Sequence, residues 1–347
     1  MCRSRGSALV LVLFVMTVLA LTGVSFTYWT ALRSRSARDG AVVVQLRAHA
    51  SSGAAVAIGR LMEDTNDFDH PAEAWHTHRP PGVEGWLEEW SPTRPGDTPD
   101  FITDYQVIDE EGKLHVLYAS SEALENLGMS EEQIASLLDW MDADDIARSE
   151  GAEDAYYAAR ATPHFCKNAP LEMLDELLMV RGFSRADYAG EDLNRNRILD
   201  PGEDDGSLSE PPDDADGRLR LGWVDLLTCV GDGRINLNTA PEAVLRVLPI
   251  SEQAVDQIVG FRAFDAGSSG ALEDHVFRSE PDIEQLQGLT ETDVLVLKQV
   301  AAFKSRHFRI FVQSTHVPTG LRYHLEVLVR LQDGKPEILQ WKGGLLR

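Results

Sequence analysis

An uncharged, apolar run from Gly6 to Leu32 constrains this 347-residue chain more than any other feature of its sequence. A helix needs about 20 such residues to cross the hydrocarbon of a bilayer, whereas the core of a cleaved secretory signal has only about 7–15. No Ala-x-Ala cleavage site follows the run. Arg3 and Arg5 precede it, and short basic segments stay on the cytoplasmic side of a membrane. The sequence therefore predicts a single-pass helix with a cytoplasmic N-terminus and an exported main domain.

The charge of the chain is concentrated outside this run. The sequence has 32 Lys and Arg against 56 Asp and Glu, a formal net charge of -24. Residues 1–38 contain five Arg and no acidic residue, so the rest of the chain carries 27 basic and 56 acidic residues. A domain of this charge repels nucleic acid and anionic lipid and is compatible with divalent cations. We expect no nucleic-acid partner.

Helical periodicity continues beyond the apolar run. Apolar residues recur at helical spacing from Val42 to Met62, with polar residues between them. This pattern predicts one helix over residues 7–64, half in the membrane and half packed on the exported domain.

Residues 65–118 are predicted to form the first part of an antiparallel sheet. Tyr105–Val107 and Leu114–Tyr118 alternate apolar and polar residues around a turn at Asp109–Gly112, which is the pattern of a β-hairpin. Residues 305–347 alternate in the same way and are interrupted by Pro-Thr-Gly and Gln-Asp-Gly-Lys. We expect three antiparallel strands there.

Between these parts, residues 119–304 are predicted to be an inserted helical domain. Short helical stretches recur in pairs joined by tight turns, and Ser130 and Ser251 are suited to cap the second helix of two pairs. The predicted fold class is therefore α+β, with a long N-terminal helix, an antiparallel sheet and an insertion of helix-turn-helix units.

One loop of the insertion, residues 192–203, has the spacing of an EF-hand calcium loop. Such a loop places an oxygen ligand at about every second position and ends on a carboxylate at the twelfth. The side chains of Asp192, Asn194, Asn196, Asp200 and Glu203 and the main-chain carbonyl of Ile198 occupy those positions. Arg197 stands where Gly is usual, and the alternative interpretation is an acidic, solvated loop. We expect a structural Ca²⁺ ion.

Two other sets of residues leave alternatives open. Asp142 and Asp144, with the segment 153–157, are candidate ligands of a second calcium ion, or they belong to a solvated helix end. Cys166 and Cys229 are two free thiols or a disulfide, because an even pair can bridge in an oxidising compartment. Free thiols are the preferred interpretation.

The start of the sequence resembles the leader of type IV pilins and pseudopilins, in which a short basic segment ends in Gly before an apolar helix. The resemblance implies that prepilin peptidase removes residues 1–6 by cutting between Gly6 and Ser7, and that Ser7 is then N-methylated. Most pilins have Glu at the fifth mature position, where it is thought to neutralise the terminal amine of the subunit above. Leu11 occupies that position here, which marks it as an assembly residue fit for a topmost subunit.

Three phrases of the insertion are similar to the K-type minor pseudopilins of type II secretion systems. They are LLDWMDADDIARSEGAEDAYY, KNAPLEMLDELLMVRG and GRINLNTAPEAVLRVL. The resemblance implies a pseudopilin fold and a non-catalytic subunit at the tip of a pseudopilus that exports folded proteins across the outer membrane. The implied partners are the I- and J-type minor pseudopilins, prepilin peptidase and the secretion platform, with exported proteins as further candidates. The implied location is the inner membrane, with the main domain in the periplasm.

Other functions fit parts of the sequence. A type IV minor pilin shares the leader and the apolar helix, and residues 235–262 resemble the helix-hairpin-helix of DNA-uptake proteins. The hairpin of that segment, Leu248–Ser251, contains Pro249, has no Gly and has no flanking basic cluster, which argues against phosphate binding. Gly-x-Ser-x-Gly and His-Glu-x-x-His motifs are missing from the sequence, and we expect no enzymatic activity.

Overall fold

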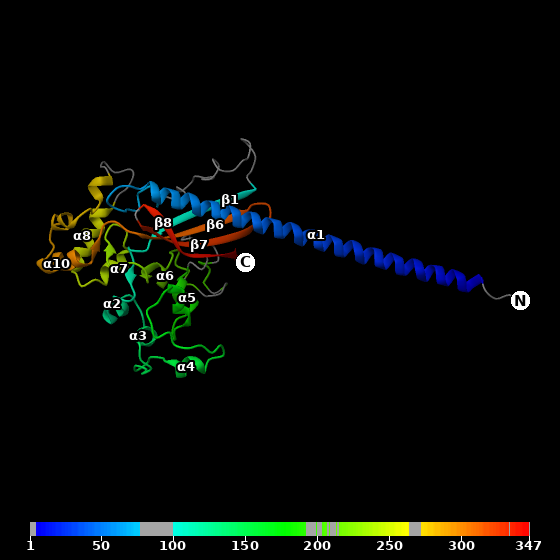
Figure 1. Ribbon diagram of the computed structural model, residues 1–347, viewed down its shortest axis with the longest axis horizontal. Coiled ribbons are helices and arrows are strands. Elements are labelled where there is room, and N and C mark those ends of the chain that lie inside the picture. The colour runs from blue at the N-terminus through cyan, green and yellow to red at the C-terminus, as the bar shows by residue number, and fades with distance from the viewer. Residues whose placement is uncertain are drawn as a thin grey trace.

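The structure is a computed structural model of the chain. It describes residues 5–76, 100–191, 199, 203–206, 208, 213, 215–263, 272–332 and 334–346. A long N-terminal helix, a four-stranded antiparallel sheet and a region of short helices make up this part of the chain (Figure 1). The predicted α+β fold class is confirmed.

Helix α1 spans Arg5–Glu63, and its two halves have different surroundings. The N-terminal half extends away from the rest of the chain (Figure 1), and the side chains from Leu9 to Leu32 are exposed. Among the described residues, α1 is the one helix long and apolar enough to cross a membrane. The C-terminal half buries Leu46, Ala50, Ala54, Ala57 and Leu61. Their spacing of three or four residues places them on one face of the helix, which lies against the sheet.

The sheet has the strand order β1–β6–β7–β8, and all neighbouring strands are antiparallel. The strands are β1 (Phe101–Asp109), β6 (His307–His316), β7 (Leu321–Gln332) and β8 (Lys335–Leu346). One face packs on α1 and forms a core with Val107, Ile310 and Val327. Gly53 of α1 lies so close to the sheet that a Cβ there would be 2.9 Å from Cγ1 of Val312. Small residues on this face of α1 therefore allow the close approach of helix and sheet.

The predicted hairpin over residues 101–118 is wrong. β1 pairs with β6, and β2 (Leu114–His115) pairs in parallel with β3 (Leu227–Thr228). The main-chain N–H of Glu110 still donates to the carbonyl of His307 at 2.9 Å, so the chain leaves the sheet only after β1 is fully paired. A nine-residue strand that joins a larger sheet is favoured over an isolated two-stranded hairpin, which is marginal in water. The helical region therefore begins at about residue 110 instead of residue 119.

The helical region lies between β1 and β6 in sequence and beside the end of α1 that is remote from the N-terminus (Figure 1). Its α-helices are α2 (Ser121–Asn126), α3 (Glu131–Met141), α4 (Asp154–Ala158), α5 (Arg185–Ala189), α6 (Trp223–Leu226), α7 (Glu242–Arg246), α8 (Glu252–Arg262), α9 (Glu280–Glu284) and α10 (Glu291–Val300). Its described part also contains the 3₁₀ helices η1 (Leu174–Met179) and η2 (Leu272–His275) and a parallel pair, β4 (Ile235–Asn236) with β5 (Ala301–Ala302).

The helices of this region pack as capped pairs around a core of their own. Ser130 and Ser251 cap α3 and α8 with their side chains, as predicted. The core includes Leu137, Leu177 and Leu237 and is separate from the core between α1 and the sheet. The region is therefore a second structural unit, attached to the sheet where β1 ends and β6 begins.

Candidate functional site

The residues predicted for processing and assembly lie in the N-terminal half of α1. Gly6 and Ser7 belong to the first turns of the helix. The side chain of Leu11 is 63% exposed, like its neighbours along the apolar half. A contiguous apolar surface of this length requires lipid or other apolar helices around it. This half of α1 is therefore compatible with a single-pass membrane anchor.

The predicted calcium ligands Asp192, Asn194, Asn196, Ile198 and Asp200 lie outside the described residues. Glu203 is described and buried. Glu191, directly before the loop, accepts a hydrogen bond on Oε2 from the main-chain N–H of Arg220 at 2.7 Å. Its Oε1 forms an ion pair with Arg220, whose Nε lies 3.5 Å away. Among the described residues, Arg220 is therefore the cation beside Glu191.

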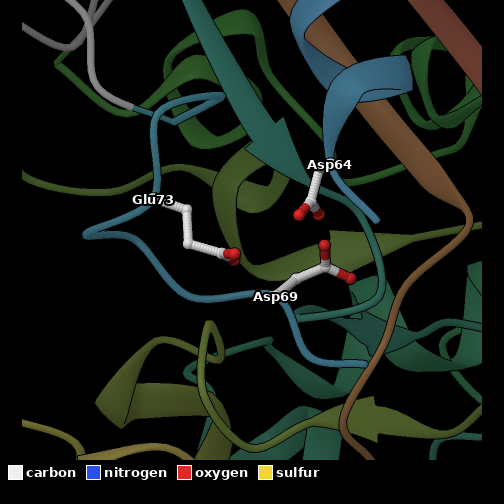
Figure 2. A group of neighbouring side chains, drawn as sticks. All are labelled: Asp64, Asp69 and Glu73. Atoms are coloured by element: carbon white, nitrogen blue, oxygen red, sulfur yellow. The ribbon is translucent and has the colours of Figure 1, made fainter. Parts of the chain in front are cut away.

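Figure 2 shows three carboxylates, Asp64, Asp69 and Glu73, that converge just beyond the end of α1. The chain supplies its own cation here, because Lys304 Nζ lies 2.5 Å from Oδ2 of Asp64 and 3.1 Å from Oδ1 of Asp69. The main-chain N–H of Ser305 also donates to Asp69 at 2.5 Å. Donors of its own segment surround Glu73. This cluster therefore ties α1 to the segment that enters β6, and it offers little to a metal ion.

Asp109, at the end of β1, holds together the two ends of the helical region. Its Oδ2 accepts hydrogen bonds from Thr239 Oγ1 at 2.5 Å, Asn236 Nδ2 at 3.0 Å and Ser305 Oγ at 2.7 Å. Burial raises the pKa of Asp109 to about 6, and the hydroxyls of Thr239 and Ser305 offset only part of this effect. The phrase that contains Asn236 and Thr239 was recognisable in the sequence, but its acceptor Asp109, distant in the chain, was not.

In the candidate DNA-binding hairpin, Leu248–Ser251, main-chain N–H groups donate hydrogen bonds to acceptors within the protein. The N–H of Ser251 donates to Oδ1 of Asp293 at 2.7 Å, and its hydroxyl donates to Oδ2 at 2.9 Å. The N–H of Ile250 donates to the carbonyl of Leu248 at 2.7 Å. A carboxylate thus stands where a phosphate would have to bind, which argues against this hairpin as a DNA site.

Cys166 and Cys229 are both free thiols in the structure. Cys166 is buried and donates to the carbonyl of Asp139 at 3.6 Å. Cys229 donates to the carbonyl of Glu172 at 3.5 Å. Burial raises the pKa of the Cys166 thiol to about 12, so this side chain behaves as a core residue and not as a nucleophile.

Comparison with protein-family models finds a match in the first part of the helical region. Residues 114–190 match the family model described as type II secretion system protein K. We refer to residues 114–190 as the protein K domain after this match. It contains two of the three phrases that carried the resemblance in the sequence, and the resemblance is confirmed. The protein K domain runs from β2 to α5 and includes α3, α4 and η1.

The arrangement of the whole chain also has a counterpart among solved structures. A chain of the crystal structure of the GspK–GspI–GspJ complex from the type 2 secretion system of enterotoxigenic Escherichia coli matches it with a TM-score of 0.55 at 17% identity. The match covers 90% of this chain and 99% of that chain. At this identity the likeness shows the fold, and it confirms that the protein K domain is joined to a pseudopilin-type helix and sheet. No curated protein matches the chain.

Proposed function

We propose that this protein is the K-type minor pseudopilin of a type II secretion system and that it caps the tip of the pseudopilus. The match to the protein K family model supports assignment to a type II secretion system, and the fold supports the role of a pseudopilin. The position of the helical region supports a place at the tip of the filament. It lies at the end of α1 opposite the apolar half (Figure 1), where a further subunit would have to stack.

Leu11 supports the same position. After cleavage at Gly6, the amine of Ser7 is a positive charge at the start of an apolar helix, and such a charge is expensive among apolar helices unless a partner neutralises it. A subunit with Leu11 cannot neutralise an amine above it, although an acidic residue of the subunit below can neutralise its own. Only the topmost subunit has no neighbour above.

The location follows from α1 and from the leader. In this proposal α1 first anchors the protein in the inner membrane, with the N-terminus in the cytoplasm and the sheet and helical region in the periplasm. Prepilin peptidase then cuts between Gly6 and Ser7, and the secretion platform moves the subunit into the filament. Intact-mass measurement of the extracted protein should show loss of residues 1–6 and N-methylation of Ser7. A chain that still begins at Met1, or one cut beyond Trp29, contradicts the pseudopilin role.

The proposed partners are the I- and J-type minor pseudopilins. The matched fold belongs to a complex with GspI and GspJ. In this chain β8 is an edge strand of the sheet, and it exposes Ile338, Leu339 and Trp341. An edge strand with exposed apolar side chains is suited to bind another protein. The role is non-catalytic: the protein caps a filament that exports folded proteins.

Immunogold labelling of pseudopili tests the tip position. One label at one end of each filament is the expected result, and label along the length contradicts it. Deletion of the gene distinguishes a type II secretion system from a type IV pilus. Loss of protein secretion, with exoproteins retained in the periplasm, supports the proposal, whereas normal secretion with loss of surface pili identifies a type IV minor pilin.

A further inference from the structure

A pocket of about 440 Å³ lies where the helical region joins the sheet. Four separate segments line it: Asp67 just after α1, residues 231–234 before β4, residues 278–280 at the start of α9, and residues 301–307 between β5 and β6. Pockets of about 300–1,000 Å³ hold small molecules, and this one has room for a few side chains of a peptide.

Three arginines of this pocket are not paired with an acid. Arg234, Arg278 and Arg306 line it and are exposed, and no ion pair involves any of them in the part of the chain that the structure describes. The guanidinium carbon of Arg278 lies 5.1 Å from the centre of the Phe68 ring, over its face, which holds this side chain in place. Each guanidinium group carries five N–H donors in a planar arrangement that matches a carboxylate.

The other charged groups at the entrance to β6 are already used within the protein. Oε1 of Glu111 lies 2.7 Å from Nδ1 of His307. Lys304 pairs with Asp64 and Asp69. These groups therefore leave the donors of the three arginines as the free binding groups on this side of the pocket.

The remaining acids of the pocket also have partners, with one exception. Asp232 accepts a hydrogen bond from the main-chain N–H of Arg234 at 3.0 Å, and Glu280 lies 4.0 Å from Nζ of Lys298. Asp67 has no hydrogen bond or ion pair among the described residues. The pocket therefore offers mainly unused donors, and a ligand that fits it supplies acceptors.

We propose that this pocket binds a short acidic segment of another protein through its carboxylates. Arginine and carboxylate form paired, charge-assisted hydrogen bonds, and three arginines around one cavity can bind more than one carboxylate. The adjoining residues 301–303 are Ala, Ala and Phe, which suit the methylene groups of acidic side chains. Nucleic acid and anionic membranes extend well beyond the pocket, and the net charge of -24 repels them. The pocket lies outside residues 114–190, and the proposal does not depend on the tip position.

Binding of a fluorescently labelled hexaglutamate peptide to the full chain in non-ionic detergent tests the proposal by anisotropy. The wild type should bind this peptide and should not bind hexaglutamine. Arg278→Gln and Arg306→Gln should each weaken binding at least about tenfold, because each removes charge-assisted hydrogen bonds. Arg322→Gln, at an exposed arginine of β7 outside the pocket, is the matched control and should bind like the wild type.

Asp67→Asn gives a change of opposite sign. It removes the one acid without a partner, so it should bind hexaglutamate more tightly than the wild type, which a general loss of structure does not produce. Melting temperatures identify the folded variants, and Arg234→Gln replaces either arginine variant that proves misfolded. Wild-type affinity in the folded arginine variants overturns the proposal. Displacement of the peptide by millimolar inorganic phosphate, beyond the effect of chloride at the same ionic strength, shows a site for small anions and also overturns it.

Discussion

Arg309 and Glu110 form an ion pair in the interior, with Arg309 Nε 2.7 Å from Oε1 of Glu110 and both side chains at most 4% exposed. Glu110 is the first residue after β1, and Arg309 lies in β6. Lys113 and Glu326 extend the pair into a buried network. Burial alone would raise the pKa of Glu110, but the charges of Arg309 and Lys113 hold it well below its usual value. The pair therefore fixes the point at which the chain leaves the sheet for the helical region.

We expect Arg309→Met to destabilise the protein strongly. It removes the Arg309 charge from Glu326 and leaves Glu110 with Lys113 as its cation, and removing one partner of a buried pair costs about 3–5 kcal/mol. Arg330→Met is the matched control, since Arg330 and its partner Glu337 are 38% and 52% exposed and an exposed pair contributes at most about 1 kcal/mol. Urea unfolding of the two variants measures the difference. Equal midpoints would show that the buried network does not stabilise the fold.

Gly53→Ala and Gly59→Ala should have opposite effects, although both replace a glycine of α1. A Cβ at position 53 would lie 2.9 Å from Val312 Cγ1, whereas nothing lies within 4 Å of one at position 59. Overpacking at position 53 should lower stability by about 1–3 kcal/mol. The better helix propensity of Ala should raise stability at position 59 by up to about 1 kcal/mol. Thermal unfolding of both variants tests this, and a stabilising Gly53→Ala would contradict the close packing of α1 on the sheet.

Asp109 should make the protein less stable as the pH rises from about 4 to about 6. Its pKa is raised from 3.8 to about 6, so the folded state holds a proton that the unfolded chain has released. The stabilisation that protonated Asp109 contributes to the folded state is fully present below pH 3.8, and it is lost as the pH rises through the pKa of Asp109 in the folded protein. A shift of this size corresponds to about 3 kcal/mol.

Stability measured at several pH values tests this assignment. Asp109→Asn cannot ionise and should lose that part of the decline, whereas Asp256→Asn, at an exposed acid of α8, should keep it. An unchanged pH profile in Asp109→Asn would contradict the raised pKa.

The predicted calcium loop should raise the melting temperature of the protein in calcium. A ligand that binds only the folded state stabilises it by about 2.7 kcal/mol at a hundred times its Kd. Asp192→Ala with Glu203→Ala should abolish this gain. Replacing the exposed acids Glu125 and Asp256 by Ala is the control for lost negative charge. A wild type that melts at the same temperature in EDTA and in millimolar calcium would contradict the predicted site.

The sequence by itself determined the features that depend on neighbouring residues. The length of the apolar run and the helical spacing that follows it specify α1, because a helix closes its hydrogen bonds within four residues. The caps Ser130 and Ser251 act within one turn of their helices. The phrases of the protein K domain were likewise recognisable from contiguous residues.

Tertiary structure decided which distant residues meet. β1 alternates as a hairpin strand would, yet it pairs with β6, some 200 residues later in the chain, because the larger sheet gives it more hydrogen bonds and a buried face against α1. Asp109 and Glu110 look like turn residues in the sequence, and only their distant partners make them buried centres of charge. Lys304, distant in the chain from Asp64 and Asp69, compensates these carboxylates only because the chain folds back on itself.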